Sequence, residues 1–176
     1  MNVCVFCSAA ELEEKYTQAA LELSRLIGER GHTFVWGGSR KGLMEKVADE
    51  ARKAGARLIA LSLERFKTVA YREADEFLEL ATLAERKTAM LDKSDAFVAV
   101  VGGLGTLDEL AEVLEFKKQG DHTKPVVVLN TEGFYDGLQE QLTTMDVNGF
   151  LPIPLSKLIY FANTPVEALD YIESHA

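Results

Sequence analysis

Short apolar runs alternate with amphipathic stretches from one end of the chain to the other. The runs rich in β-branched and aromatic residues predict about seven strands. They cover residues 2–6, 33–36, 58–63, 77–80, 96–101, 126–130 and 158–162. Because strands that alternate with helical patterns are typical of repeated βα units, the sequence predicts an α/β fold built on a parallel sheet.

Between these runs, apolar residues recur at spacings of three and four, which predicts amphipathic helices. The first begins before Tyr16 and is expected to stop at Gly31, and the second covers about residues 43–54 and stops at Gly55. Two further helices are expected where this spacing recurs, one with Leu83, Lys87, Met90 and Leu91, and the next with Leu107, Leu110, Ala111 and Leu114.

The clearest helix start lies near the end of the sequence. Thr164 is expected at the N-cap, Pro165 at the first helical position and Glu167 at the third, which is the pattern of a capping box with a first-turn proline. Residues 149–156 form an irregular stretch that leads to the final strand. No linker or repeat divides the chain, so we expect one domain over residues 1–176.

Composition narrows the classes of function. Nineteen Lys and Arg against 28 Asp and Glu give a net charge of -9, so the chain lacks the basic footprint of a nucleic-acid-binding protein and must hold any phosphate locally. No apolar stretch approaches the roughly 18 residues that span a bilayer, so no membrane partner is expected. The first residues resemble no export signal, and a cytoplasmic location is expected.

Cys4 and Cys7 have the spacing of a thioredoxin-like redox pair. They fall in and just after the first predicted strand, where residues three apart point to opposite faces of the sheet. We therefore expect two buried, unpaired thiols. A zinc site is not expected, because no second cysteine pair or histidine pair accompanies them.

The strongest local feature is a strand that runs directly into a glycine-rich turn and then a helix from Leu107. The turn consists of Gly102, Gly103, Leu104, Gly105 and Thr106. Glycines let the backbone approach an anion, and a helix N-terminus points N–H groups at it. Asp108 stands where a dinucleotide fingerprint needs Gly or Ala, and no P-loop Lys-Ser/Thr pair follows. The turn is either an anion site or a plain tight turn.

A second glycine turn, at residues 37–42, also connects a strand to a helix. Leu43 and Met44 occupy the P-loop Lys and Ser/Thr positions, so that chemistry is absent. Arg40 and Lys41 within it either meet a phosphate or are solvated loop cations.

Two charged residues have alternative interpretations. Glu109 either completes a capping box with Thr106 or places an ionised carboxylate beside the anion site, an arrangement that suits a sugar phosphate. Arg86, within Glu85-Arg86-Lys87, either belongs to a surface charge cluster or faces a site, because it falls outside the inward spacing of its helix.

The combination of Glu85-Arg86-Lys87, Ser94-Asp95-Ala96-Phe97 and the segment from Gly102 to Glu109 resembles the LONELY GUY (LOG) family. These are cytokinin riboside 5'-monophosphate phosphoribohydrolases, often mislabelled lysine decarboxylases. Residues 3–8, 42–44, 120–126 and 133–136 extend the resemblance almost end to end. It implies a Rossmann-like, doubly wound, mostly parallel sheet with helices on both faces, and usually a homodimer.

The resemblance also implies a reaction and its residues. The enzyme would hydrolyse the N-glycosidic bond of purine nucleoside 5'-monophosphates, cytokinin-type or adenosine, to free base and ribose 5-phosphate, without a metal or cofactor. Glu109 would bind the ribose and stabilise the positive charge that grows on it, with Arg86 as an electrostatic clamp. The substrate-binding residues would be Lys87, Gly102, Gly103, Leu104, Gly105, Thr106 and Asp108. No residue is assigned as proton donor to the leaving base.

The chain departs from the family pattern at several positions. The departures are Ser39, Glu45, Ala84, Val101, Glu115, Phe116 and Lys118. The phosphate and sugar ends of the site are expected to be retained and the base pocket to be altered.

Two other functions are weighed beside this one. A nucleotide-binding sensor or carrier would keep the pocket without hydrolysis. A lysine decarboxylase would need a Schiff-base lysine and a partner for the pyridine nitrogen of its cofactor, and the resemblance assigns neither.

Overall fold

The computed structural model describes all 176 residues and contains one sheet of seven strands. The strands are β1 (Asn2–Phe6), β2 (Thr33–Trp36), β3 (Leu58–Leu63), β4 (Glu76–Leu80), β5 (Ala96–Ala99), β6 (Val126–Leu129) and β7 (Tyr160–Ala162). Their order is β4-β3-β2-β1-β5-β6-β7, and all neighbours are parallel. The strand order reverses at β1, so the predicted doubly wound, Rossmann-like fold is confirmed.

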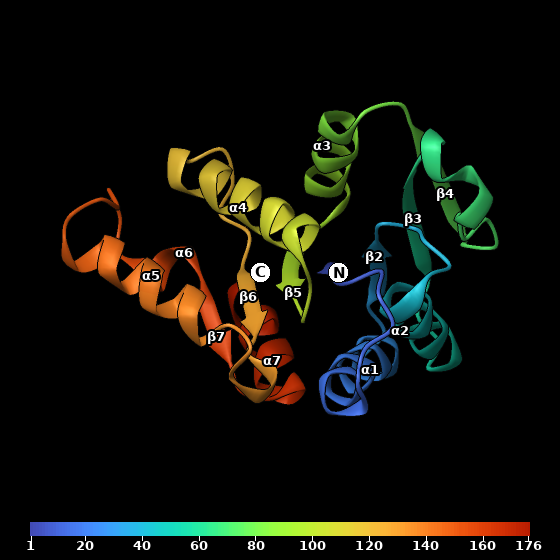
Figure 1. Ribbon diagram of the computed structural model, residues 1–176, viewed down its shortest axis with the longest axis horizontal. Helices are drawn as coiled ribbons and strands as arrows, with labels where there is room; N and C mark the ends of the chain where they lie inside the picture. Colours follow the sequence, from blue (N-terminus) through green and yellow to red (C-terminus); the bar gives the residue numbers. More distant parts are fainter.

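Helices cover both faces of this sheet (Figure 1). One face carries α1 (Glu14–Glu29), α2 (Gly42–Lys53) and α7 (Pro165–His175). The other carries α3 (Leu83–Lys93), α4 (Leu104–Gln119), α5 (Asp136–Val147) and the single turn α6 (Leu155–Leu158). The 3-10 helices η1 (Glu64–Val69) and η2 (Thr131–Gly133) follow β3 and β6. No helix is both long enough and apolar enough to cross a membrane.

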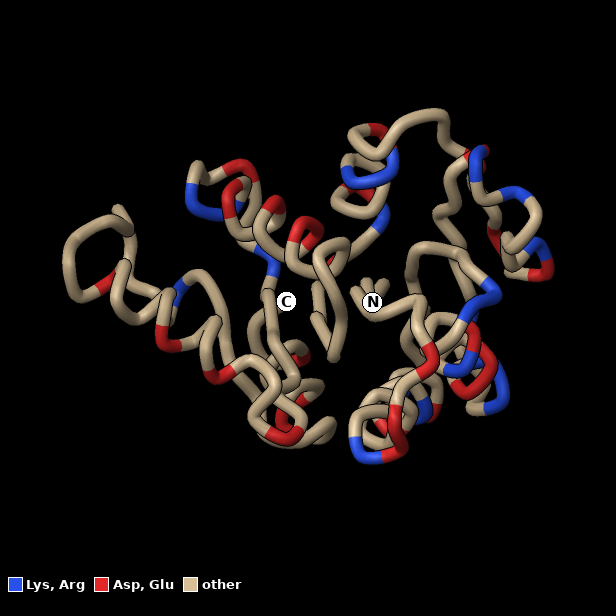
Figure 2. The backbone as a smooth tube through the Cα atoms, viewed as in Figure 1, with Lys and Arg blue, Asp and Glu red and all other residues tan.

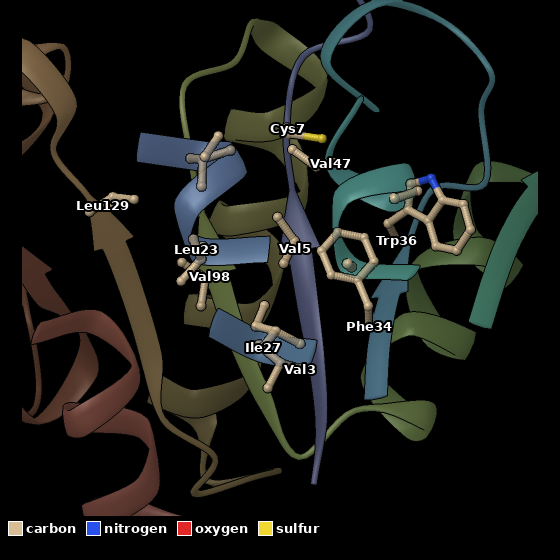
Figure 3. Packing of buried hydrophobic residues seen from close by; sticks show 14 of the residues in the cluster. Val3, Val5, Cys7, Leu23, Ile27, Phe34, Trp36, Val47, Val98 and Leu129 are labelled. Atoms are coloured by element: carbon tan, nitrogen blue, oxygen red, sulfur yellow. The ribbon is translucent and has the colours of Figure 1, made fainter. Parts of the chain in front are cut away.

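Side-chain alternation along the strands divides the core into two layers. Val3 and Val5 of β1 pack beside Leu23 and Ile27 of α1, as Figure 3 shows. The two cysteines are free and buried, Cys7 in this layer and Cys4 in the layer of α3 and α4, so the prediction of divergent thiols is confirmed. Burial raises the pKa of both thiols, which keeps them protonated at neutral pH.

Three predicted element bounds are wrong by two or more residues. β5 ends at Ala99, although the two residues beyond it still bond to β1 and the loop after it: the Val100 N–H donates to the Phe6 carbonyl, and the Val101 carbonyl accepts from the Ser8 N–H. β7 begins at Tyr160, because Leu158 belongs to α6. α4 begins at Leu104, so the last three residues of the glycine turn form its first helical turn. β4 and β6 differ from the prediction by one residue each.

The predicted capping box of α7 is only half formed. The Thr164 hydroxyl accepts a hydrogen bond from the Glu167 N–H, as expected. The Glu167 carboxylate, however, accepts from the Asn163 N–H and from the Tyr160 hydroxyl, not from Thr164. The start of the helix is thus correct while one of its two cap bonds goes to a neighbouring residue.

Candidate active site

A cavity of about 620 Å³ opens at the edge of the sheet where parallel strands end. Its lining comes from the loop after β1, the second glycine turn, η1, α3 and the start of α4. This edge, where the strand order reverses, is where open α/β sheets bind ligands. The fold therefore places both glycine turns beside the one region in which a ligand is expected.

Arg86 and Glu109 meet at this cavity. Nη2 of Arg86 donates to Oε1 of Glu109 at 2.7 Å, and the two side chains are only 12% and 10% exposed. Nε of Arg86 is buried without a hydrogen-bond partner. The guanidinium thus keeps part of its donor capacity unused, which is uncommon for buried polar groups and typical of functional sites.

The Glu109 carboxyl is poised to titrate near neutral pH. Burial raises its pKa to about 7, and the positive charge of Arg86 acts in the opposite direction. A carboxyl with such a shift, in a cavity beside a specific charged partner, is a candidate catalytic group.

The local sequence fixes Arg86 through a capping box that our sequence analysis missed. The Thr82 hydroxyl accepts from the Glu85 N–H at 3.1 Å, and the Glu85 carboxylate accepts from the N–H groups of Ala81 and Thr82 at 3.0 and 3.3 Å. Glu85 thereby defines the first turn of α3, and Arg86 follows it directly. The pattern Thr-x-x-Glu before a helical stretch is the signal that would have revealed the cap.

Lys87 contacts carboxylates rather than the main cavity. Its Nζ lies 3.2 Å from the Asp108 carboxylate and also pairs with Glu112. Together with Phe116 it lines a much smaller hollow between α3 and α4. In this structure Lys87 therefore ties the two helices together, and its predicted contact with substrate stays a prediction.

The first glycine turn supplies most of one cavity wall. Gly103, Gly105, Thr106 and Asp108 line the cavity, whereas Gly102 and Leu104 do not. A Cβ on Gly102 would lie 2.0 Å from Oγ1 of the buried Thr106, while a Cβ on Gly105 would meet no atom within 4 Å. Gly102 thus serves internal packing, and Gly103 and Gly105 leave open space on the cavity side.

The alternative that Glu109 caps its own helix is wrong. α4 begins at Leu104 with Gly103 at the N-cap and no side-chain cap, so Thr106 lies inside the helix. Glu109 pairs with Arg86 instead.

The two cations of the second glycine turn differ in their surroundings. Arg40 pairs with Glu73 and, at 3.6 Å, with Glu45, whereas Lys41 lines the cavity.

Most departures from the family pattern lie outside the cavity of this chain. Ser39 lines it, but Glu45, Ala84, Val101, Glu115, Phe116 and Lys118 do not. Glu115 and Lys118 pair with each other on the surface of α4, far along the helix from the carboxyl edge of the sheet. The cavity is also lined by Met44, Arg65, Phe66, Val69 and Leu83. Sequence reasoning missed η1 there, although the carboxyl end of β3 marks its position.

Solved structures share this fold. The molybdenum cofactor carrier protein of Chlamydomonas reinhardtii aligns with a TM-score of 0.73 at 22% identity, covering 98% of this chain and 96% of that one. The molybdenum cofactor binding protein of the phototrophic bacterium Rippkaea orientalis gives 0.71 at 23% identity, covering 98% and 94%. At these identities the likeness concerns the fold alone.

Proteins related in sequence have a higher identity to this chain than these structures do. A family model described as a possible lysine decarboxylase matches residues 44–172. LOGL9 of Oryza sativa subsp. japonica, a probable cytokinin riboside 5'-monophosphate phosphoribohydrolase, is 39% identical over 154 residues, which cover 86% of this chain and 68% of the relative. The cytokinin riboside 5'-monophosphate phosphoribohydrolase of Mycobacterium tuberculosis is 34% identical, covering 92% and 88%. LOG2 of Arabidopsis thaliana, of the same description, is 33% identical, covering 99% and 83%. This chain therefore belongs to the LONELY GUY family, which its motifs already resemble.

Proposed function

We propose that this protein hydrolyses the N-glycosidic bond of purine nucleoside 5'-monophosphates, releasing free base and ribose 5-phosphate. The observation that carries the proposal is the nearly buried pair of Arg86 and Glu109 in the cavity beside the start of α4. The names of the relatives from rice, Arabidopsis and Mycobacterium tuberculosis support the same reaction class. Water supplies the hydroxyl that adds to C1' and the proton that ends on the base, so no further reactant is needed.

In the proposed complex, the phosphate binds at the N-terminus of α4. The backbone there faces open space at Gly103 and Gly105, and the positive end of the helix dipole favours an anion. The hydroxyl of Thr106, which lines the same wall, is a further donor. The ribose then lies next to Glu109, one helical turn further along α4.

The carboxylate of Glu109 stabilises the positive charge that develops on the sugar. When the bond between C1' and the base breaks, its electron pair leaves with the base, and positive charge grows on C1' and the ring oxygen of the sugar. A fixed carboxylate stabilises such an oxocarbenium-like transition state. Arg86 opposes the effect of burial on the Glu109 pKa and so favours the ionised form that this role needs.

A lysine decarboxylase does not fit the same cavity. Pyridoxal phosphate enzymes use a lysine that forms a Schiff base with the cofactor and an acidic or basic partner for its pyridine nitrogen. Lys41, the lysine that lines this cavity, is exposed on a glycine turn. Of the two carboxylates that line the cavity, Glu109 is paired with Arg86 and Asp108 with Lys87. The hydrolase assignment gives Arg86 and Glu109 a role, and the decarboxylase assignment does not.

The proposal includes a homodimer that works in the cytoplasm. Leu104, Leu107 and Ala111 form an exposed apolar stripe along α4, with Leu104 86% exposed. Such a stripe on a helix is suited to pairing with a second copy. The two free thiols suit a reducing compartment.

The direct test is to incubate the protein with adenosine 5'-monophosphate and its isopentenyl derivative and to follow free base and ribose 5-phosphate by chromatography. Glu109→Ala removes the proposed stabilising charge, and Glu115→Ala removes an exposed carboxylate of the same helix as a matched control. We expect release by the wild type and Glu115→Ala but not by Glu109→Ala. Nucleotide binding without any release would overturn the hydrolase and favour a sensor or carrier.

A further inference from the structure

A second set of ion pairs joins α3 and α4 directly beside Arg86 and Glu109. Figure 2 shows basic positions on α3 next to acidic positions along α4. Nζ of Lys87 lies 3.2 Å from both oxygens of the Asp108 carboxylate and also pairs with Glu112. Lys87 follows Arg86 in the sequence, and Asp108 precedes Glu109. The contacts of Lys87 therefore fix the two helices against each other at the point where the catalytic pair of the proposed hydrolase meets.

The two carboxylate partners of Lys87 differ in exposure. The side chain of Asp108 is 55% exposed, whereas those of Lys87 and Glu112 are only 16% and 24% exposed. Exposed ion pairs are weak because water and salt screen them, and burial reduces this screening. Hydrogen bonding to Glu112 is also the main reason that the pKa of Lys87 is raised. Glu112 is therefore the partner that holds Lys87 in place.

Glu109 stands between two spaces in the structure. It lines the active-site cavity and also the small hollow between α3 and α4, whereas Lys87 and Glu112 line only the hollow. The remaining walls of the hollow are apolar and consist of Phe6, Met90, Leu91, Val113 and Phe116. At about 10 Å³ the hollow has no room for a substrate. Lys87 and Glu112 thus reach the catalytic carboxylate from behind, through surroundings in which charges interact strongly.

The charge of Lys87 acts on Glu109. The titratable and charged groups around this carboxylate are Arg86 and Lys87 of α3, Asp108 and Glu112 of α4, and Cys4 and Cys7 of β1. Both thiols are protonated at neutral pH. Burial is the main reason that the pKa of Glu109 is raised; the charge of Asp108 acts in the same direction, and the charges of Arg86 and Lys87 act in the opposite one. Because Glu112 pairs with Lys87, it controls how strongly this ammonium acts.

We propose that Glu112 is a positioning residue that acts on Glu109 through Lys87. The inference rests on the proposed hydrolase and adds a residue to its site. Glu112 holds the ammonium of Lys87 in the hollow and neutralises its charge, so Arg86 remains the partner of the catalytic carboxylate. Without Glu112, the ammonium is free to turn toward Glu109 and competes with Arg86 for it.

The test follows the titration of Glu109 by NMR in protein labelled with carbon-13 at the side-chain carboxyl of glutamate. The signal of Glu109 is the one that Glu109→Gln lacks. Glu112→Gln leaves the charge of Lys87 without its partner and should lower the pKa of Glu109, whereas Lys87→Met removes that charge and should raise it. Both substitutions keep the length of the side chain. Glu115→Gln, which removes an exposed carboxylate of the same helix, is the matched control and should leave the pKa unchanged.

The double variant decides whether Glu112 acts through Lys87. In the Lys87→Met background, Glu112→Gln should shift the pKa of Glu109 by less than half as much as it does in the wild type. A shift of half or more would mean that Glu112 acts on Glu109 directly, and it would overturn the inference. The absence of any shift in Glu112→Gln alone would overturn it as well.

Initial rates connect the titration to catalysis. On the alkaline plateau, where Glu109 is ionised, Glu112→Gln should lower kcat by about 3- to 10-fold and leave KM unchanged, because a positioning residue does not touch the substrate. A raised KM with an unchanged kcat would assign Glu112 and Lys87 to substrate binding and contradict the inference. If the wild type releases no base from any nucleotide, the proposed function fails instead. The NMR titration then still tests whether Glu112 acts on Glu109 through Lys87.

Discussion

Arg86 and Glu109, which lie on different helices, form the most deeply buried ion pair of the protein, with 2.7 Å between nitrogen and oxygen. Charges interact more strongly away from water, and removing one partner of a buried pair leaves the other uncompensated. The pair thus couples the protonation of Glu109 to the presence of Arg86. Both of the first two predictions depend on this coupling.

Activity should depend on pH through Glu109. Because burial raises its pKa to about 7, lowering the pH through this value protonates the carboxylate and removes the charge that stabilises the transition state. We expect kcat/KM to fall about tenfold for each pH unit below the inflection and to level off above it. Glu109→Gln should show a low residual rate without this inflection. A wild-type profile that is flat around pH 7 would contradict the assignment.

Replacing Arg86 should move the same inflection. Arg86→Met leaves the buried Glu109 carboxylate without its partner, so the pKa of Glu109 rises further and the acidic limb shifts to higher pH. We expect kcat to fall by about 10²-fold or more at neutral pH. Arg86→Lys keeps the charge and should shift the limb less. An unshifted limb in Arg86→Met would show that the ion pair does not control this titration.

The strands are predicted from the sequence more accurately than the geometry of the site is. Strands such as β1 and β3 are continuous buried apolar runs, so their bounds are read directly from the pattern. That Arg86 meets Glu109 depends on how α3 and α4 pack, which no local pattern encodes. The six residues of η1 show no periodicity, and α5 has no fully buried residue, so neither was predicted. The sequence predicts the start of α4 at Leu107, three residues late, because the Leu-Gly-Thr segment of the glycine turn carries no start signal for a helix.

Alanine substitutions at two glycines of the first turn should have different effects, one on stability and the other on substrate binding. Gly102→Ala forces a Cβ against the buried Thr106 side chain and should cost about 1–3 kcal/mol of unfolding free energy. Gly105→Ala meets no protein atom and replaces a helical glycine, so stability should rise by roughly 0.5 kcal/mol. If the phosphate binds beside Gly105, that variant should still raise KM. Urea unfolding and initial rates on both variants check this, and an unchanged KM in Gly105→Ala would place the phosphate elsewhere.

Loss of the side-chain cap of α3 should lower kcat as well as stability. Thr82→Ala removes the side-chain bond to the Glu85 N–H and should cost about 1 kcal/mol of stability. Because Arg86 follows in the same helical turn, we also expect a lower kcat. Thr164→Ala removes the equivalent bond of α7, on the opposite face of the sheet, and should destabilise by a similar amount without changing kcat. Equal kcat values in the two variants, at equal stability, would mean that the cap does not position Arg86.

The exposed stripe on α4 should hold two copies of the chain together. Ala111 is exposed, so Ala111→Arg introduces a bulky charge into the stripe without disturbing the core of the monomer. We expect light scattering at micromolar concentration to show a dimer for the wild type and a monomer for this variant. Gln18→Arg adds the same charge at an exposed position of α1, on the other face of the sheet, and should remain dimeric. A monomeric wild type would contradict the dimer, whereas a dimer that survives Ala111→Arg would move its interface away from α4.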